Sequence, residues 1–166
     1  MTPTDVSKKY FEFLTQIEQA ERQGDYPAML RLCFNSLPLI SLWVEHEVRE
    51  YGGFDPKCIP AIEVACKYLG YVNDLDGIER VEKVVKGSPH LEAWQKTVDS
   101  ARQTGELAQK VFEHIEQNPG CIQSKLADEL GMENESVREL CYYLERTGNL
   151  RREKSGRSYA LFVKEG

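Results

Sequence analysis

The sequence predicts a mainly α-helical protein in two parts: an all-helical N-terminal domain, 1–105, and a C-terminal domain, 106–166, that ends in a small β-hairpin. Two observations predict this class. Apolar residues recur at three- and four-residue spacing along most of the chain, which is typical of amphipathic helices. Near the C-terminus the pattern changes to two short runs around Ser155-Gly156, which is typical of a hairpin. A length of 166 residues allows two small domains.

The N-terminal part carries start signals for a succession of helices. Tyr10, Phe11, Leu14 and Ile17 give the first helix its apolar face, and we expect it to end near Gly24. Each later helix should start where a capping residue or a proline precedes an apolar stripe. The expected starts are Asp25, Ser36 with Pro38 in the first turn, Asp55-Pro56, Asp74 or Asp76, and Ser88-Pro89.

Two stretches of this part are similar to each other. The segment 23–30, with Gly24, Asp25 and Ala28, resembles the turn between the helices of a tetratricopeptide repeat. The segment 61–78 looks like the first helix and turn of a second copy, at an offset of 49 residues (Gly24 to Asn73) instead of about 34. The resemblance implies a helical-repeat layer that binds a protein partner or a second copy of the chain. A plain helical bundle remains the alternative.

The C-terminal part predicts a helix-turn-helix followed by a hairpin. An amphipathic stretch, 107–117, is followed by the break Pro119-Gly120 and by a short helix, 124–130. Gly131 makes a turn, and 134–146 forms a third helix before two short strands begin at Leu150. This order is that of a winged helix, which places its third helix in a groove of DNA and the hairpin, or wing, beside it.

The block 106–164 resembles the bacterial winged-helix regulators of the MarR and ArsR type. The residues that carry the resemblance are Asn118-Pro119-Gly120, Leu126-Ala127, Leu130-Gly131-Met132, Val137, Cys141, Leu144-Glu145, Gly148 and the run 150–159. The resemblance implies a DNA-binding transcriptional regulator, whose helical half mediates dimerisation or senses a partner. We expect a homodimer on duplex DNA, because one winged helix reads only a few base pairs.

The expected DNA contacts fall on three elements. On the third helix the outward residues are Asn134, Ser136, Arg138 and Tyr142, since Val137, Leu140, Cys141 and Leu144 take the inner face. The start of the second helix supplies Gln123, Ser124 and Lys125, where helix amides commonly hold a phosphate. The wing supplies Arg151, Arg152, Lys154 and Arg157, with Arg152 and Lys154 expected on its exposed tip.

The charge of the chain opposes this reading. The net charge is −6, with 12 basic and 16 acidic residues in 1–105 and 9 basic and 11 acidic residues in 106–166. Glu133, Glu135 and Glu139 also lie on the third helix, where carboxylates would repel phosphates. The alternative function is therefore a non-enzymatic protein-interaction adaptor whose winged helix does not bind DNA.

No motif indicates an enzyme. We find no phosphate-binding glycine loop, no nucleophile elbow and no histidines at metal-ligand spacing, so we expect no catalytic residues, no metal and no cofactor. The five cysteines include no C-x-x-C pair and are expected to be reduced core thiols. No signal peptide or membrane-spanning run is expected, because the longest apolar run is 37–44, which predicts a cytoplasmic protein.

Overall fold

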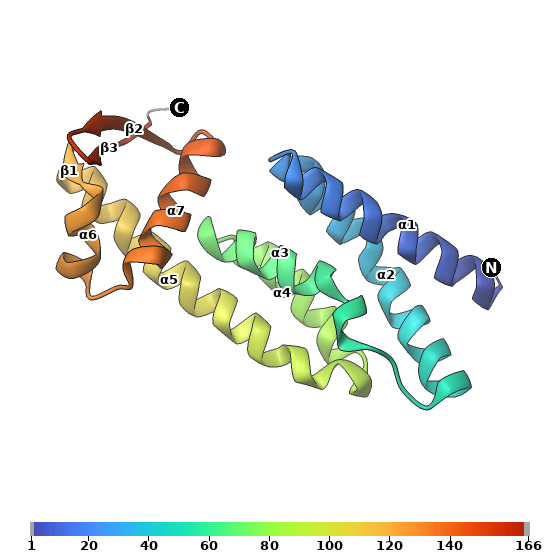
Figure 1. The fold of residues 1–166 in the computed structure, drawn as a ribbon. Coiled ribbons are helices and arrows are strands. Elements are labelled where there is room, and N and C mark those ends of the chain that lie inside the picture. Colours follow the sequence, from blue (N-terminus) through green and yellow to red (C-terminus); the bar gives the residue numbers. More distant parts are fainter. Residues whose placement is uncertain (1, 165–166) are drawn as a thin grey trace. The chain divides into compact units, whose positions relative to one another are not determined.

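The computed structural model describes residues 2–164, apart from the side chains of Pro3 and Lys57 (Figure 1). It confirms a mainly α-helical chain with a small antiparallel sheet and a winged-helix-like arrangement at its C-terminal end. The chain forms two compact units. One comprises Met1–Leu69 and Asp74–Arg102, and the other comprises Gly70–Asn73 and Gln103–Gly166.

The first unit begins with two long helices, α1 (Pro3–Arg22) and α2 (Tyr26–Tyr51), which pack side by side (Figure 1). The expected helix start at Ser36 is wrong, because α2 continues through Pro38. The Ser36 hydroxyl donates backward to the Cys33 carbonyl at 2.8 Å and caps no later amide. The helix continues because one buried stripe passes both sides of Pro38, which itself faces solvent. That stripe comprises Met29, Cys33, Leu37, Ile40 and Val44.

The helix expected from Asp55-Pro56 is also corrected. Pro56–Cys58 form a single 3₁₀ turn, η1, and the helix α3 starts later, at Pro60, and ends at Tyr71. Pro60 has no N–H, so the Pro56 carbonyl accepts from Ile59 N at 3.1 Å instead of continuing an α-helical ladder. Pro60 at the first helical position costs nothing, because that amide would be unpaired anyway.

The two stretches that resemble each other in sequence form turns with the same hydrogen bonds. Asp25 N donates to the Ala20 carbonyl at 3.0 Å, and Asp74 N donates to the Leu69 carbonyl at 2.9 Å. Each aspartate then caps the next helix through its side chain, α2 at Ala28 N and α4 (Leu75–Lys86) at Gly77 N. The residue before each aspartate, Gly24 or Asn73, has a positive φ of 70° or 52°. The local similarity is therefore one of turn geometry.

A continuous helix, α5 (Gln95–Gln117), follows the 3₁₀ segment η2 (Pro89–Trp94). The sequence predicts two helices here, one on either side of residue 105, whereas the structure has one. In the first unit, the Arg102 guanidinium makes a bidentate ion pair with Glu82 of α4, at 2.6 and 2.8 Å. Gln95 donates to the same carboxylate at 2.8 Å. These bonds, with Arg102 first, lower the pKa of Glu82 to about 2.

The second unit contains a strand, two helices and a hairpin that follow α5. They are β1 (Cys121–Ile122), α6 (Gln123–Leu130), α7 (Asn134–Arg146), β2 (Leu150–Ser155) and β3 (Ser158–Val163). The strand order is β1-β3-β2, with both pairings antiparallel. Their core includes Val111 and Ile115 of α5, Leu126 of α6 and Leu161 of β3, all buried. Gly131 ends α6 in the left-handed conformation, at φ 66°, as its place in the sequence predicts.

By length and composition alone, α2 is able to cross a membrane. It has 26 residues, a mean hydropathy of 1.3 over its most apolar window, and 44% of that window is buried. A core helix of a globular unit passes the same test, and α2 has the buried stripe of such a helix. The helix also contains Glu45, Glu47 and Glu50 near its end. It is therefore not a convincing membrane span.

The continuity of α2 can be tested at its internal proline. Pro38→Ala restores an N–H donor to the Phe34 carbonyl and should raise the free energy of unfolding by about 1–2 kcal/mol in urea denaturation. Pro27→Ala, at the start of the same helix where proline is favourable, should not raise it. Equal effects of the two substitutions would contradict a helix that continues through Pro38.

Glu82 predicts an acid-sensitive contribution to stability. Its folded pKa, about 2, lies below the ordinary 4.5, so its ion pair stabilises the fold fully above about pH 4.5 and is lost as the pH falls toward 2. Glu82→Gln should lower the free energy of unfolding at pH 7 by about 1–2 kcal/mol, since solvent screens the partly exposed Arg102. The difference from wild type should shrink below pH 4.5. The exposed Glu92→Gln is the control, and its effect should be small at every pH.

Candidate nucleic-acid interface

The third helix of the winged-helix-like end, α7, presents the face that the sequence predicts. Val137, Leu140, Cys141 and Leu144 are all at least 97% buried. Asn134, Ser136, Arg138 and Tyr142 are exposed. The N-cap residue of α7, Glu133, does not accept a hydrogen bond from the first-turn amides through its side chain. The free amides of this turn and the side chains of Asn134, Ser136 and Arg138 are therefore presented together at the N-terminal end of α7, and Tyr142 lies further along the helix.

The start of α6 differs from the expectation. Gln123 is buried, with 9% of its surface exposed, so it does not offer its side chain to a phosphate. The Ser124 amide is already used, because it donates to the Ser158 hydroxyl of β3 at 3.1 Å. Lys125 is exposed and makes no ion pair within residues 2–164. Of the groups predicted to contact a phosphate from this element, Lys125 and the Ser124 side chain are therefore the ones that are exposed.

Arg152 is the largest correction, because its side chain is only 10% exposed and does not lie on the wing tip. Its Nη2 donates to Glu145 Oε1 of α7 at 3.0 Å, and its Nη1 donates to Gln123 Oε1 of α6 at 3.3 Å. The guanidinium also lies 4.3 Å from the centre of the Tyr159 ring on β3. Side chains alternate along a strand, so Arg152 shares the inward face of β2 with the buried Leu150. This alternation is the sequence signal from which the inward position of Arg152 could have been predicted.

Arg151 faces the other side of the sheet and is also engaged. It forms an ion pair with Glu153 on the same strand. Its guanidinium lies 4.3 Å from the centre of the Phe162 ring, across the hairpin. Its side chain is half exposed, at 52%, so a phosphate would have to compete with Glu153 for this cation.

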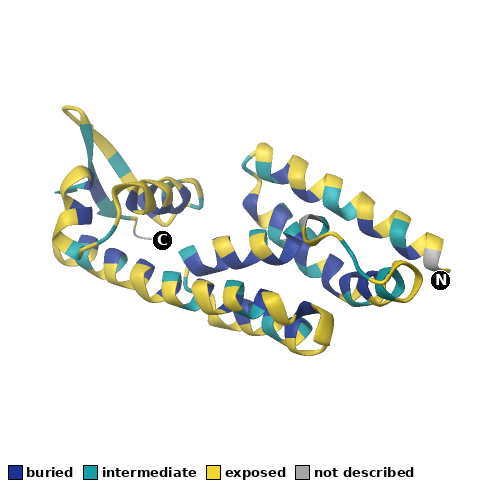
Figure 2. Ribbon diagram, turned by 60° about the horizontal axis from the view of Figure 1, so that its bottom comes forward, coloured by how far each residue is buried: buried dark blue, intermediate teal, exposed yellow. Residues whose placement is uncertain are grey.

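The wing tip carries the cations that remain. Lys154 and Arg157 are exposed, and neither forms an ion pair or a ring contact among the described residues. Figure 2 shows the end of the hairpin as exposed, in yellow. Gly156, at φ 62°, makes the turn between them. The basic surface of the wing is therefore its tip alone.

The outward face of α7 is close to neutral. Glu133 and Glu135 are exposed at its first turn, and Arg138 and Arg146 are exposed further along. Glu139 accepts a hydrogen bond from the Tyr71 hydroxyl at 2.7 Å. The Tyr71 ring also packs on Tyr143 of α7, with the ring centres 5.4 Å apart. No pattern in the sequence linked Tyr71, which comes from the end of α3, to this helix.

Among residues 2–164, no group of three His, Cys, Asp or Glu side chains is placed to hold a metal ion. All five cysteines are free. Burial raises the pKa of the Cys33, Cys66 and Cys141 thiols to about 12, so they stay protonated at neutral pH and are poor nucleophiles.

Comparison with known proteins adds no relative. No protein-family model matches the chain, and no curated protein and no solved structure matches it. The function is therefore inferred from the residues of this chain and their geometry.

The buried position of Arg152 predicts a stability effect that a wing-tip residue would not have. Arg152→Ala leaves Glu145 and Gln123 without their partner and should lower the free energy of unfolding by about 1–3 kcal/mol. Lys154→Ala, two residues along the same strand face but exposed, should change it by less than about 0.5 kcal/mol. Urea denaturation of the full chain measures both. If both substitutions had similarly small effects on the free energy of unfolding, the result would contradict a buried, paired Arg152.

Proposed function

We propose that this chain is a DNA-binding transcriptional regulator of the winged-helix type, similar to the MarR and ArsR regulators. The observation that carries the proposal is the placement of four cations that form no ion pair within residues 2–164. Lys125 lies at the start of α6, Arg138 on the first turns of α7, and Lys154 and Arg157 at the wing tip. In a winged helix these three elements meet the DNA backbone and the major groove.

In this proposal the residues divide by role. Asn134, Ser136, Arg138 and Tyr142 face base edges and sugars from α7, while Ser124, Lys125, Lys154 and Arg157 contact phosphates. Arg152 and Gln123 act as positioning residues and Arg151 contributes little, since their polar groups are engaged within the protein. The N-terminal helical part of the chain, whose two similar turns resemble those of tetratricopeptide repeats, provides the dimer or partner contact in the cytoplasm.

A second candidate is supported by the charge of α7. Glu133, Glu135 and Glu139 lie on the helix that would enter the groove, and two wing arginines are paired internally. These features favour a protein-interaction adaptor, in which the exposed α7 face and wing contact a protein partner. Such an adaptor would have no counterion-release contribution to binding, so salt dependence separates the two functions.

Fluorescence anisotropy with mixed-sequence duplexes of about 30 base pairs tests the proposal. The three cationic phosphate contacts, Lys125, Lys154 and Arg157, predict a log–log salt slope of about −3 per monomer. Lys154→Glu with Arg157→Glu should weaken binding at least about tenfold and reduce the slope by about two. Both residues are exposed, so the fold should be unaffected.

The matched control is Lys8→Glu with Lys9→Glu, on the exposed side of α1. It changes the net charge by the same amount and should leave the slope unchanged. If wild type fails to bind duplex DNA at 50 mM salt, or if both double variants weaken binding equally, the regulator function is excluded and the adaptor takes its place.

A further inference from the structure

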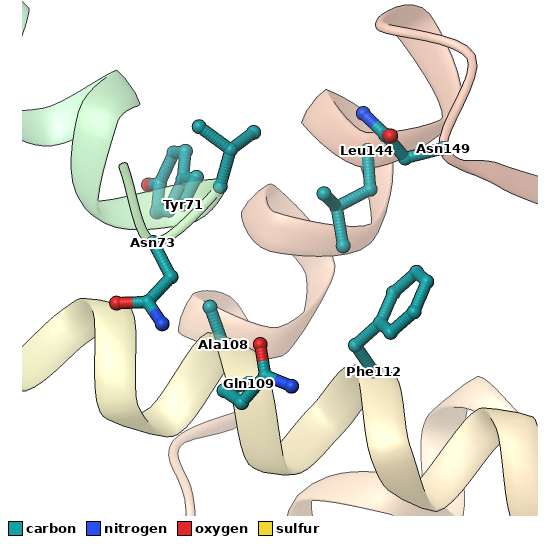
Figure 3. A pocket seen from close by; sticks show the side chains of 8 residues that line it. Tyr71, Asn73, Ala108, Gln109, Phe112, Leu144 and Asn149 are labelled. Carbon is teal, nitrogen blue, oxygen red and sulfur yellow. The ribbon is translucent and has the colours of Figure 1, made fainter. Parts of the chain in front are cut away.

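A pocket of about 170 Å³ lies within the second unit, against the side of α7 that carries Leu144. Figure 3 shows its walls: Leu144 descends from α7, Gln109 and Phe112 rise from α5, and Asn73 closes the end beside Tyr71. The volume is that of a site for one small ring, since a protein cavity of about 150 Å³ is large enough to bind benzene.

One part of the lining is apolar. The Phe112 ring and the Leu144 side chain face the pocket from two helices (Figure 3). Val72, which is 39% exposed, is a third apolar residue of the lining. An aromatic face and branched aliphatic groups favour a flat apolar body, which can lie against the ring. Burial of that body supplies the non-directional part of the binding free energy.

The polar part of the lining includes two side-chain amides, each of which uses one of its two N–H groups within the protein. Gln109 Nε2 donates to Glu113 Oε1 at 3.1 Å, and Asn149 Nδ2 donates to Thr147 Oγ1 at 2.9 Å. Their carbonyl oxygens, Oε1 and Oδ1, accept no hydrogen bond within the described residues. None of the described residues that line the pocket is charged. These two carbonyl oxygens are therefore available to accept from an uncharged donor.

We propose that this pocket is a binding site for a small, uncharged aromatic molecule that carries N–H donors, such as an aromatic amine. The ring lies against Phe112 and Leu144, and the N–H groups donate to Gln109 Oε1 and Asn149 Oδ1. The proposal does not depend on DNA binding. It would hold equally if α7 contacts a protein, because the one α7 residue in the lining is the buried Leu144 and not the exposed Arg138.

The test compares two ligands of one shape, aniline and toluene, in NMR titrations of the full chain. Toluene is the more apolar, so any apolar crevice without directed acceptors binds it more tightly. The proposed site reverses that order. Aniline should bind with a Kd of about 1 mM or tighter and at least about threefold more tightly than toluene. The side-chain NH₂ signals of Asn73, Gln109 and Asn149 should shift in a saturable way.

Variants assign the preference to the amides. Gln109→Leu and Asn149→Leu should each weaken aniline binding about threefold or more and leave toluene binding equal or tighter. Gln103→Leu, an exposed position on the same helix outside the pocket, should change neither. Thermal unfolding confirms that each variant is folded. The proposal is overturned if toluene binds wild type more tightly, if no saturable shift occurs, or if aniline affinity survives both substitutions.

Discussion

The guanidinium of Arg152 is the contact on which the surface of the second unit depends. From β2 it contacts Glu145 of α7, Gln123 of α6 and the Tyr159 ring of β3. A buried leucine at this position would fill space but would not fix the directions of three neighbours. Removing a cation from water has a cost, and Nε of Arg152 has no hydrogen-bond partner among the described residues. The remaining groups offset this cost with directional bonds, which hold α6, α7 and the hairpin in one arrangement.

This use of Arg152 changes the electrostatic argument about function. A cation that is paired within the protein releases few counterions when the protein meets DNA. In the proposed complex with DNA, the wing would contribute through Lys154 and Arg157, and α7 would contribute a surface on which acids balance bases. Affinity for DNA would then come from few phosphates in each copy, so a second copy on the same duplex becomes necessary for tight binding. The same near-neutral surface suits a protein partner, which explains why composition alone does not separate the two functions.

Local signals in the sequence predict the helices of the second unit. The features that the sequence does not predict depend on contacts between residues far apart in the chain. The bounds of α7 follow from its apolar stripe and from Gly131 before it, so the sequence predicts them as the structure has them. The sequence predicts a helix start at Ser36, because Ser36 and Pro38 are local start signals. The prediction is wrong because Leu37 and Ile40 are buried against the rest of the unit, which keeps α2 continuous. The paired strand β1 has two residues, too few for any periodic pattern. Gln123 was assigned to the surface because nothing near it in sequence reveals that Arg152 needs an acceptor there.

The division of the chain into two units shows the same limit at a larger scale. The change of pattern near residue 105 marks where the winged-helix residues begin, yet the second unit also includes Gly70–Asn73. Tyr71 packs on Tyr143 and donates to Glu139, and the Asn73 side chain lies against Gly105, where a Cβ would displace it. A cut at residue 105 removes these contacts and divides α5 in its middle, which leaves amides without carbonyl partners. A fragment that keeps them must begin near residue 70, and it then includes α4 of the first unit. No single cut separates the two units, so any fragment that retains all contacts of the second unit also contains residues of the first.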